Sequence, residues 1–244
     1  HRDLHSFPTR RSSDLAAALI ESNLFYDTMQ VLNDGAAIYI GFARGMVVRG
    51  NIVRGHRGSG PAHAYYMDEM SDSCVVENNL AVDTAWPTHN HMTINCKIRN
   101  NVFIDHGHQK LTFPRSLGMI FEKNILVAEE ITFQYPSGKE VLPESASPVP
   151  EAVKPFLKAD GIVAMPDNII FSRSGKVHYN VLADYKTVRS VPLQARDGTL
   201  FTDPMLNDPE QGDYSFQPGS PAVKAGIHSI NVSKAGRIKP VTKH

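Results

Sequence analysis

The histidines of this chain are concentrated in one part of the sequence. Six of the 11 lie between positions 56 and 108: His56, His63, His89, His91, His106 and His108. Imidazole side chains transfer protons near neutral pH, bind metal ions and form hydrogen bonds with hydroxyl groups. The sequence therefore predicts a histidine-rich patch, provided that the fold brings these positions to one side.

Three interpretations of these histidines stay open. The His-x-His pairs at 89/91 and 106/108, together with the carboxylate of Asp83 or Asp105, could bind a metal ion. The histidines could also be exposed loop residues without a joint role. Beside the aromatic ring of Trp86, they could instead bind sugars and transfer protons. We expect no cofactor, although a divalent cation is compatible with the first interpretation.

Two adjacent carboxylates, Asp68 and Glu69, follow an expected strand. Hydrolysis of a glycosidic bond needs a proton donor and a second carboxylate that acts as base or nucleophile. In an extended strand these two side chains point to opposite faces, so only one reaches a common groove unless the chain bends there. The candidate catalytic residues are Asp68, Glu69 and His91, with Asp83 and Asp105 as substitutes for the first two.

The remaining candidates would bind substrate. They are His63, Trp86, His89, His106, His108, Lys110 and Arg115. Imidazoles and an aromatic ring are suited to sugar hydroxyls and ring faces. The two cations suit an acidic sugar, although solvated surface cations are an equally good interpretation of them.

An internal repeat surrounds these residues. Asparagines followed by apolar residues stand at Asn23, Asn51, Asn79, Asn101, Asn124 and Asn180. Their spacings are 28, 28, 22, 23 and 56 residues, which is a period of 22 to 28 with one long insertion. A period of this length is typical of a solenoid.

The residues before each asparagine alternate in character, with apolar side chains three positions before it. Two positions before it, the charges alternate in sign from repeat to repeat: Arg49, Glu77, Arg99 and Glu122. If strands stack in parallel about 4.8 Å apart, this column is an outward ladder of opposite charges. We therefore predict short parallel strands with one buried face and asparagine side chains bonded to one another at a corner.

The two cysteines, Cys74 and Cys96, occupy equivalent positions in successive repeats. Parallel neighbouring strands orient their Cβ atoms alike, which gives poor torsion for a disulfide. We therefore predict two buried free thiols.

The N-N-x-x repeats and the tail DPMLNDPEQGDYSFQPGSPAVKAGI resemble right-handed parallel β-helix proteins of the carbohydrate-active kind, which include glycoside hydrolases and polysaccharide lyases. The resemblance implies an all-β, single-stranded right-handed parallel β-helix from a bacterium, secreted or periplasmic. In similar proteins a run I-Y-x-D-E-x-S-S is followed one coil later by H-x-H. Here that pattern corresponds to Asp68-Glu69 and His89-x-His91.

This resemblance implies a glycoside hydrolase that binds a polysaccharide or oligosaccharide in a groove along the solenoid. A first alternative is a polysaccharide lyase acting on a uronate-containing glycan, with His91 or Lys110 as the base and Arg115 as the carboxylate partner. A second alternative is a non-catalytic module for glycan binding or adhesion. The fold alone does not choose among them, because this scaffold carries several activities.

Composition limits the partners. The chain has 25 basic and 25 acidic residues, and its Lys and Arg are scattered. This argues against nucleic acid or an anionic membrane as a partner, and no apolar stretch is long enough for a spanning helix. We expect a monomer.

Residues 1–15, HRDLHSFPTRRSSDL, resemble the translation of a sequencing-library adapter, and we interpret them as an artefact without a structural role. The β-helix domain is expected over 16–230, with an inserted loop at about 136–160 and a C-terminal tail at 231–244. The β-helix is expected to be N-terminally truncated, so that its first strands form an uncapped edge.

Overall fold

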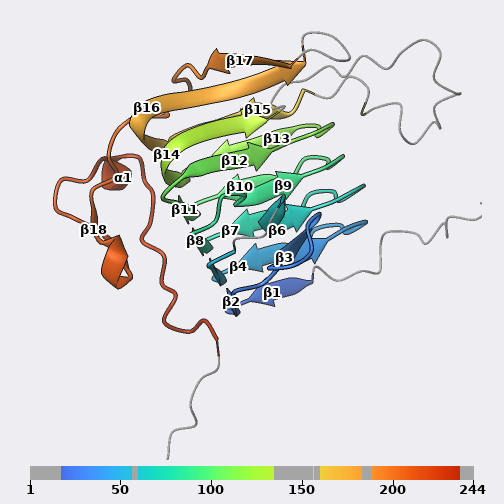
Figure 1. Ribbon diagram of the computed structural model, residues 1–244, viewed down its shortest axis with the longest axis horizontal. Coiled ribbons are helices and arrows are strands. Elements are labelled where there is room, and N and C mark those ends of the chain that lie inside the picture. The colour runs from blue at the N-terminus through green and yellow to red at the C-terminus, as the bar shows by residue number, and fades with distance from the viewer. Residues whose placement is uncertain (1–17, 57–59, 135–155, 157–159, 183–187, 237–244) are drawn as a thin grey trace, which may run out of the picture.

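The computed structural model describes residues 18–56, 60–134, 156, 160–182 and 188–236 (Figure 1). In these residues the protein is all-β, and most strands pair in parallel. The adapter-like residues 1–15 lie outside the described residues, as does most of the expected loop at 136–160.

The strands form three parallel stacks, and each pass of the chain adds one strand to each stack. The first stack contains, in order, β1 (Leu19–Glu21), β4 (Val47–Arg49), β7 (Val75–Glu77), β10 (Lys97–Arg99), β13 (Met119–Glu122) and β15 (Ile162–Ala164). The second contains β2 (Leu24–Tyr26), β5 (Ile52–Arg54), β8 (Leu80–Val82), β11 (Val102–Ile104) and the first parts of β14 (Ile125–Gln134) and β16 (Ile169–Leu182).

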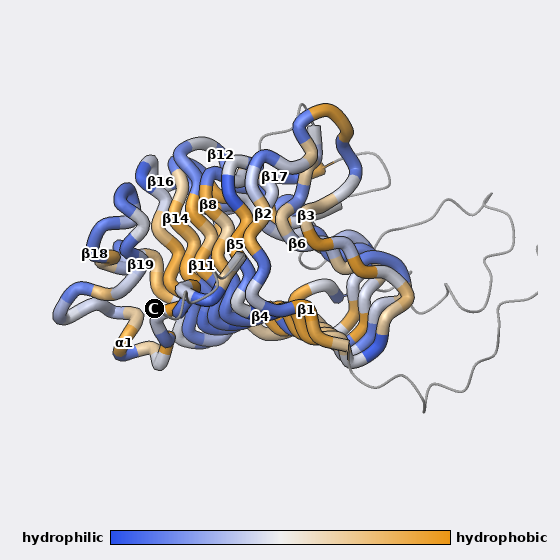
Figure 2. The backbone as a smooth tube through the Cα atoms, turned by 90° about the horizontal axis from the view of Figure 1, so that it is seen from below, coloured by the Kyte–Doolittle hydropathy of each residue, from blue (hydrophilic) through white to orange (hydrophobic). Residues whose placement is uncertain are grey.

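The third stack contains β3 (Gly35–Ile40), β6 (Ala62–Met67), β9 (Thr88–Asn90), β12 (His108–Thr112) and the second parts of β14 and β16. Because β14 belongs to both, the second and third stacks form one 11-stranded sheet. The strand β17 (Val188–Pro192) pairs antiparallel with β16. In the end-on view the three stacks enclose a common interior (Figure 2).

A ladder of asparagine side chains joins the passes at the corner between the first and second stacks. The Oδ1 atom of Asn101 accepts the backbone N–H and the Nδ2–H of Asn79, both at 3.0 Å. The Nδ2 atom of Asn101 donates in turn to Val76 O at 2.9 Å and to Asn124 Oδ1 at 3.0 Å. The buried amide is therefore fully bonded, and the predicted corner of bonded asparagines is confirmed for these repeats.

The last asparagine predicted for this column, Asn180, was wrong. After Asn124 the ladder continues to Asn168, whose Oδ1 accepts the backbone N–H of Asn124 at 2.9 Å, and it ends at Thr199 Oγ1. The predicted member, Asn180, lies in the third stack, where it pairs with Gln134. The inserted segment precedes Asn168 and so lengthens one spacing to 44 residues, while β16 continues without a break from the second stack into the third.

A left-handed residue precedes each ladder asparagine. These residues are Ser22, Gly50, Asn78, Asn100, Lys123 and Asp167, with φ between 49° and 63°. Glycine and asparagine adopt this conformation at the least cost, which explains why the repeat contains pairs of asparagines. The first asparagine of a pair turns the chain, and the second enters the ladder.

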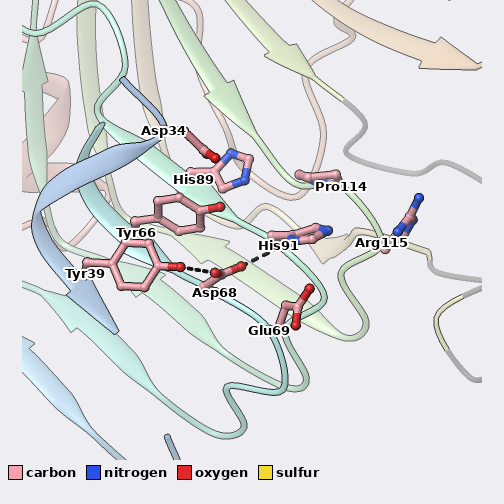
Figure 3. A pocket seen from close by; sticks show the side chains of 9 residues that line it. All are labelled: Asp34, Tyr39, Tyr66, Asp68, Glu69, His89, His91, Pro114 and Arg115. Atoms are coloured by element: carbon pink, nitrogen blue, oxygen red, sulfur yellow. Dashed lines mark hydrogen bonds and ion pairs between the residues drawn. The ribbon is translucent and has the colours of Figure 1, made fainter. Parts of the chain in front are cut away.

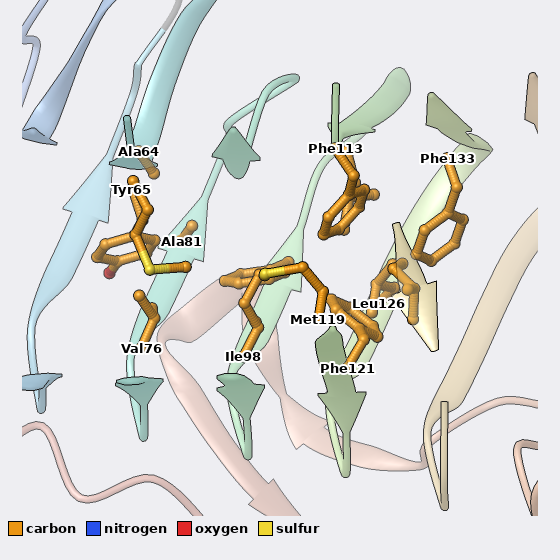
Figure 4. Packing of buried hydrophobic residues seen from close by; sticks show 14 of the residues in the cluster. Ala64, Tyr65, Val76, Ala81, Ile98, Phe113, Met119, Phe121, Leu126 and Phe133 are labelled. Atoms are coloured by element: carbon orange, nitrogen blue, oxygen red, sulfur yellow. The ribbon is translucent and has the colours of Figure 1, made fainter. Parts of the chain in front are cut away.

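The interior is apolar and contains residues from all three stacks, including Tyr65, Ile98, Phe121 and Leu126 (Figure 4). Both Cys74 and Cys96 are buried free thiols in this interior, as predicted. On the outer face of the first stack, Arg99 Nε lies 2.6 Å from Glu77 Oε2, and Arg99 pairs in register with Glu122. The expected ladder of opposite charges is thus present, and each exposed pair contributes a few tenths of a kcal/mol.

The middle strands of the second stack, β8 and β11, are buried on both faces, so the prediction of one buried face was wrong for these two strands. All three residues of β8 and of β11 are buried. The C-terminal segment, with β18 (Leu206–Asp208), the short helix η2 (Pro209–Gln211), β19 (Asp213–Phe216) and α1 (Pro221–Lys224), covers their outer side (Figures 1 and 2). A second apolar cluster forms there between strand residues such as Leu80 and segment residues such as Tyr214.

The C-terminal segment also reaches the first strands. The backbone N–H of Gly236 donates to Ser22 O at 2.9 Å, and Val232 packs against the second apolar cluster. Part of the expected tail at 231–244 therefore packs on the strands. Among the described residues, β1 and β2 each pair with one strand only, and Leu24 is 40% exposed and Tyr26 is 66% exposed.

We expect Asn101→Ala to lower the free energy of unfolding by about 3 kcal/mol or more, because it leaves several buried donors and acceptors without partners. Urea unfolding measures this loss. The matched control, Asn180→Ala, lies outside the ladder and should cost less than about 1 kcal/mol. Equal losses in the two variants would contradict the special role of the ladder.

Removal of residues 231–244 should accelerate hydrogen exchange over residues 19–26. Loss of the Gly236 bond and of the covering apolar side chains makes local opening easier, by about 1 kcal/mol or roughly fivefold in rate. Exchange in β8 and β11 should stay slow, because these strands are paired on both sides. Unchanged exchange at residues 19–26, measured by mass spectrometry, would show that the segment does not stabilise this edge.

Candidate functional site

The outward face of the third stack carries a row of rings. In register across the strands, Tyr39 pairs with Tyr66, and Tyr66 pairs with His89. The ring centroids are 4.6 Å apart for Tyr39 and Tyr66, and 4.3 Å apart for Tyr66 and His89. The parallel register thus converts a spacing of 23 to 27 residues in the sequence into direct contact.

A pocket of about 430 Å³ opens at the end of this row (Figure 3). We call it the Asp68 pocket. Its lining residues are Asp34, Tyr39, Tyr66, Asp68, Glu69, His89, His91, Pro114 and Arg115. Five of the candidates, Asp68, Glu69, His89, His91 and Arg115, are therefore brought together here.

Both adjacent carboxylates line the Asp68 pocket because the chain bends after Met67. The strand β6 ends at that residue, and the backbone N–H of Ser71 donates to Asp68 O at 3.1 Å, which closes a turn over residues 68–71. The condition under which Asp68 and Glu69 could share a groove is therefore met. In an uninterrupted strand they would have pointed to opposite faces.

The carboxylate of Asp68 accepts two side-chain hydrogen bonds. The hydroxyl of Tyr39 donates to Oδ2, and His91 Nδ1 lies 3.1 Å from Oδ1. Burial acts to raise the pKa of Asp68, but the bonds from Tyr39, from the backbone N–H of Glu69 and from His91 outweigh it, so that the pKa is lowered. The same bond raises the pKa of Tyr39 to about 12, so the phenol keeps its proton. Asp68 is therefore an ionised acceptor at neutral pH.

The bond to Asp68 fixes the tautomer of His91. An ionised carboxylate only accepts hydrogen bonds, so Nδ1 of His91 carries the proton that it shares with Asp68. The other ring nitrogen, Nε2, is then an acceptor whenever the imidazole is neutral. An imidazole oriented by a carboxylate in this way can take a proton from water or from a substrate.

Two further imidazoles beside the pocket are held neutral. Burial lowers the pKa of His89 to about 3 and that of His63 to about 2, with smaller contributions from neighbouring ionisable groups. The Nδ1 atom of His89 is bonded to Thr112 Oγ1. The ring of His63 lies between those of His89 and Trp86, at 4.6 Å and 5.5 Å. Neither ring serves as a cation at neutral pH, but both can bond to hydroxyl groups.

Other candidates line a second pocket of about 360 Å³, which we call the Trp86 pocket. It is lined by His56, Gly60, Ala85, Trp86, Asp105, His106, Gly107 and His108. The histidine-rich patch is thus divided between two pockets, with His63 between them. The cation Lys110 lies 5.0 Å from the centre of the Trp86 ring.

The substitute carboxylates are not in the Asp68 pocket. Asp105 lines the Trp86 pocket and accepts the backbone N–H of Gly107 at 2.8 Å. Asp83 lies 3.5 Å from His106 Nε2. Asp83 also has a left-handed φ of 54°, which fits a turn-forming role.

Tyr39, Tyr66 and Asp34 line the Asp68 pocket, although none of them was among the predicted site residues. A signal for Tyr39 was present, since the segment AIYIGF at 37–42 precedes AYYMDE at 64–69 by one repeat. Aligning these segments places Tyr39 next to Tyr66. No comparable signal marks Asp34, which enters the pocket from the turn before β3.

Within the described residues, no group of three or more His, Cys, Asp and Glu side chains is arranged to hold a metal ion. Among the same residues, no helix has the length and apolar character needed to cross a membrane.

Comparison of the chain with protein-family models, with curated proteins and with solved structures gave no match. The assignment of a function therefore depends on the geometry of the two pockets.

We expect Tyr39→Phe to raise the pKa of Asp68 by about half a unit to one unit, because loss of one hydrogen bond to the ionised form costs about 1 kcal/mol. Titration of the Asp68 carboxyl signal by NMR measures the shift. The control is Tyr26→Phe, on the exposed edge. A pKa of Asp68 that is unchanged in Tyr39→Phe would show that the phenol does not hold the carboxylate ionised.

Proposed function

We propose that this protein is a glycoside hydrolase that binds a polysaccharide or oligosaccharide on the outward face of the third stack. The observation that carries the proposal is the meeting of Asp68 and Glu69 in one pocket, with Asp68 held ionised and bonded to His91. Hydrolysis of a glycosidic bond requires a proton donor and a second group that acts as base or nucleophile. Here Glu69 would be the donor, and His91, oriented by Asp68, would be the base.

The row of rings beside the carboxylates supports a sugar ligand. Aromatic and imidazole rings present apolar faces to the C–H groups of a sugar and polar atoms to its hydroxyls. The rings of Tyr39, Tyr66 and His89 are in contact and line the same pocket as the carboxylates. A bound sugar would therefore contact both the ring surface and the acidic groups.

In the proposed reaction Glu69, in its protonated form, donates its proton to the glycosidic oxygen as the bond to the anomeric carbon breaks. A water molecule attacks that carbon and gives a proton to Nε2 of His91. The bond to Asp68 stabilises the imidazolium that forms, because the carboxylate is ionised and close. Asp68 thus positions His91, and Glu69 and His91 are the catalytic residues.

A polysaccharide lyase is the second candidate. The favouring observation is that His91, as a base, and Arg115, as a partner for a uronate carboxylate, line the same pocket. Three carboxyl groups, those of Asp34, Asp68 and Glu69, also line it and would repel a uronate. The charge of the pocket therefore favours hydrolysis of a neutral sugar over lyase action.

We also propose that the three stacks form a single-stranded right-handed parallel β-helix of the carbohydrate-active kind. The strand orders of the stacks, each with one strand per pass, support a helical path. A right-handed path is the usual one for parallel strands joined by crossovers. A polysaccharide substrate is consistent with a secreted or periplasmic protein.

We expect Asp68→Asn and Glu69→Gln each to reduce the rate of hydrolysis by about 100-fold or more, the usual effect of removing a proton-transfer group or its partner. Release of reducing ends from a panel of neutral glycans measures it. The control, Glu129→Gln, changes an exposed residue of β14 and should keep the rate of the unmodified protein.

Absence of reducing ends with every glycan would contradict the hydrolase proposal. An ultraviolet-absorbing unsaturated product would instead identify a lyase. Binding of glycans that is retained by all variants, without turnover in the unmodified protein, would identify a binding module.

A further inference from the structure

The Trp86 pocket has no role in the reaction proposed for the Asp68 pocket. Residues from three passes of the chain line it, including His56, Trp86 and His108. Its position at the start of β9 and β12 separates it from the Asp68 pocket, which lies near the ends of β6 and β9. The two pockets therefore lie towards opposite ends of the same strands.

A continuous set of rings joins the two pockets. The ring of His89 lines the Asp68 pocket, and the ring of Trp86 lines the Trp86 pocket. Between them, His63 contacts both rings, with centroid distances of 4.6 Å and 5.5 Å. The path runs along the strand direction, and from residue 86 to residue 91 an extended chain covers about 17 Å. A chain of several sugar units could reach both pockets.

The polar groups of the Trp86 pocket suit hydroxyls. The side chain of His56 is 1% exposed, and its Nδ1 lies 2.7 Å from Thr28 Oγ1. Its Nε2 has no hydrogen-bond partner among the described residues. Burial lowers the pKa of His56 to about 4 and also lowers that of His108, so both rings are neutral near pH 7. Neutral imidazoles can both donate to and accept from a hydroxyl group.

The charges of the Trp86 pocket disfavour an acidic ligand. The lining residues include the carboxylate of Asp105, and none of those described is Lys or Arg. Two cations lie beside lining residues without being among them: Lys110 is 5.0 Å from the centre of the Trp86 ring, and Arg173 Nη1 donates to Asp105 O at 3.1 Å. Among the lining residues themselves, a uronate would lie beside the Asp105 carboxylate and neutral imidazoles, and the guanidinium of Arg173 is already bonded to the backbone of Asp105.

We propose that the Trp86 pocket is a second sugar-binding subsite, which holds a neutral unit of the same glycan whose scissile bond lies in the Asp68 pocket. The glycan then runs along the strands of the third stack, across the direction in which the strands are stacked. This inference rests on the proposed hydrolase function, and it adds the class and orientation of the substrate.

Tryptophan fluorescence tests the subsite directly, because Trp86 is the only tryptophan of the chain. The Asp68→Asn variant should prevent turnover during the titration. Neutral β-1,4-linked gluco- and xylo-oligosaccharides, from disaccharide to hexasaccharide, are added to it. We expect a saturable change in emission with oligosaccharides long enough to reach both pockets, and none with oligogalacturonides of equal length.

Calorimetry tests the subsite without tryptophan fluorescence, and two separate variants ensure that the result does not depend on a single substitution. In calorimetric titrations, Trp86→Ala and His108→Ala should each weaken binding of the longer neutral oligosaccharides by about tenfold. Binding of the disaccharide at the Asp68 pocket should change little. The exposed-site variant Glu129→Gln serves as the control and should bind as the unmodified protein does.

The outcomes separate this inference from the hydrolase proposal. One outcome would overturn the subsite and leave the hydrolase proposal standing. In it, the unmodified protein releases reducing ends, but no oligosaccharide of any length changes the emission, and neither Trp86→Ala nor His108→Ala changes the affinity. Tighter binding of oligogalacturonides than of neutral oligosaccharides would overturn the neutral class of ligand. Emission changes without hydrolysis of any glycan would support the subsite and contradict the hydrolase proposal.

Discussion

The in-register bonding of asparagine side chains is the constraint on which this structure depends. From Asn51 to Asn168 each ladder amide is buried, so its polar atoms must be bonded within the protein. The side chain of Asn101 meets this demand only if the passes above and below are in exact register with it. A slip of one residue would break these bonds and would turn every strand side chain to the opposite face.

That register determines which residues become neighbours in the site. The contacts of Tyr66 with Tyr39 and with His89 occur between residues that share a position in successive passes. The same stacking places His91 over Asp68, so that the carboxylate and imidazole bond to each other. A substitution that loosened the ladder would therefore disturb the Asp68 pocket, although no ladder residue lines it.

The C-terminal segment makes the outer face of the second stack different from the outer face of the third stack. It covers the second stack, where residues such as Val102 and Ile125 need an apolar partner. Within the described residues, the third stack instead presents tyrosine, histidine and carboxylate side chains that line pockets. Partial burial among these rings keeps His63 and His89 neutral, since desolvation disfavours their charged forms. The resulting surface has neutral donors and acceptors beside an ionised carboxylate.

The sequence by itself determined the parallel strands, the charge column with Arg99 and the asparagine ladder up to Asn124, because these depend on a period that recurs along the chain. It did not distinguish Asn168 from Asn180, since an insertion interrupts the period and both asparagines precede apolar residues. Only the tertiary structure decided that Asp68 and Glu69 share a pocket, that Tyr39 joins them and that the histidines divide between two pockets. Those outcomes depend on the turn over residues 68–71 and on packing between different passes, which the period alone does not specify.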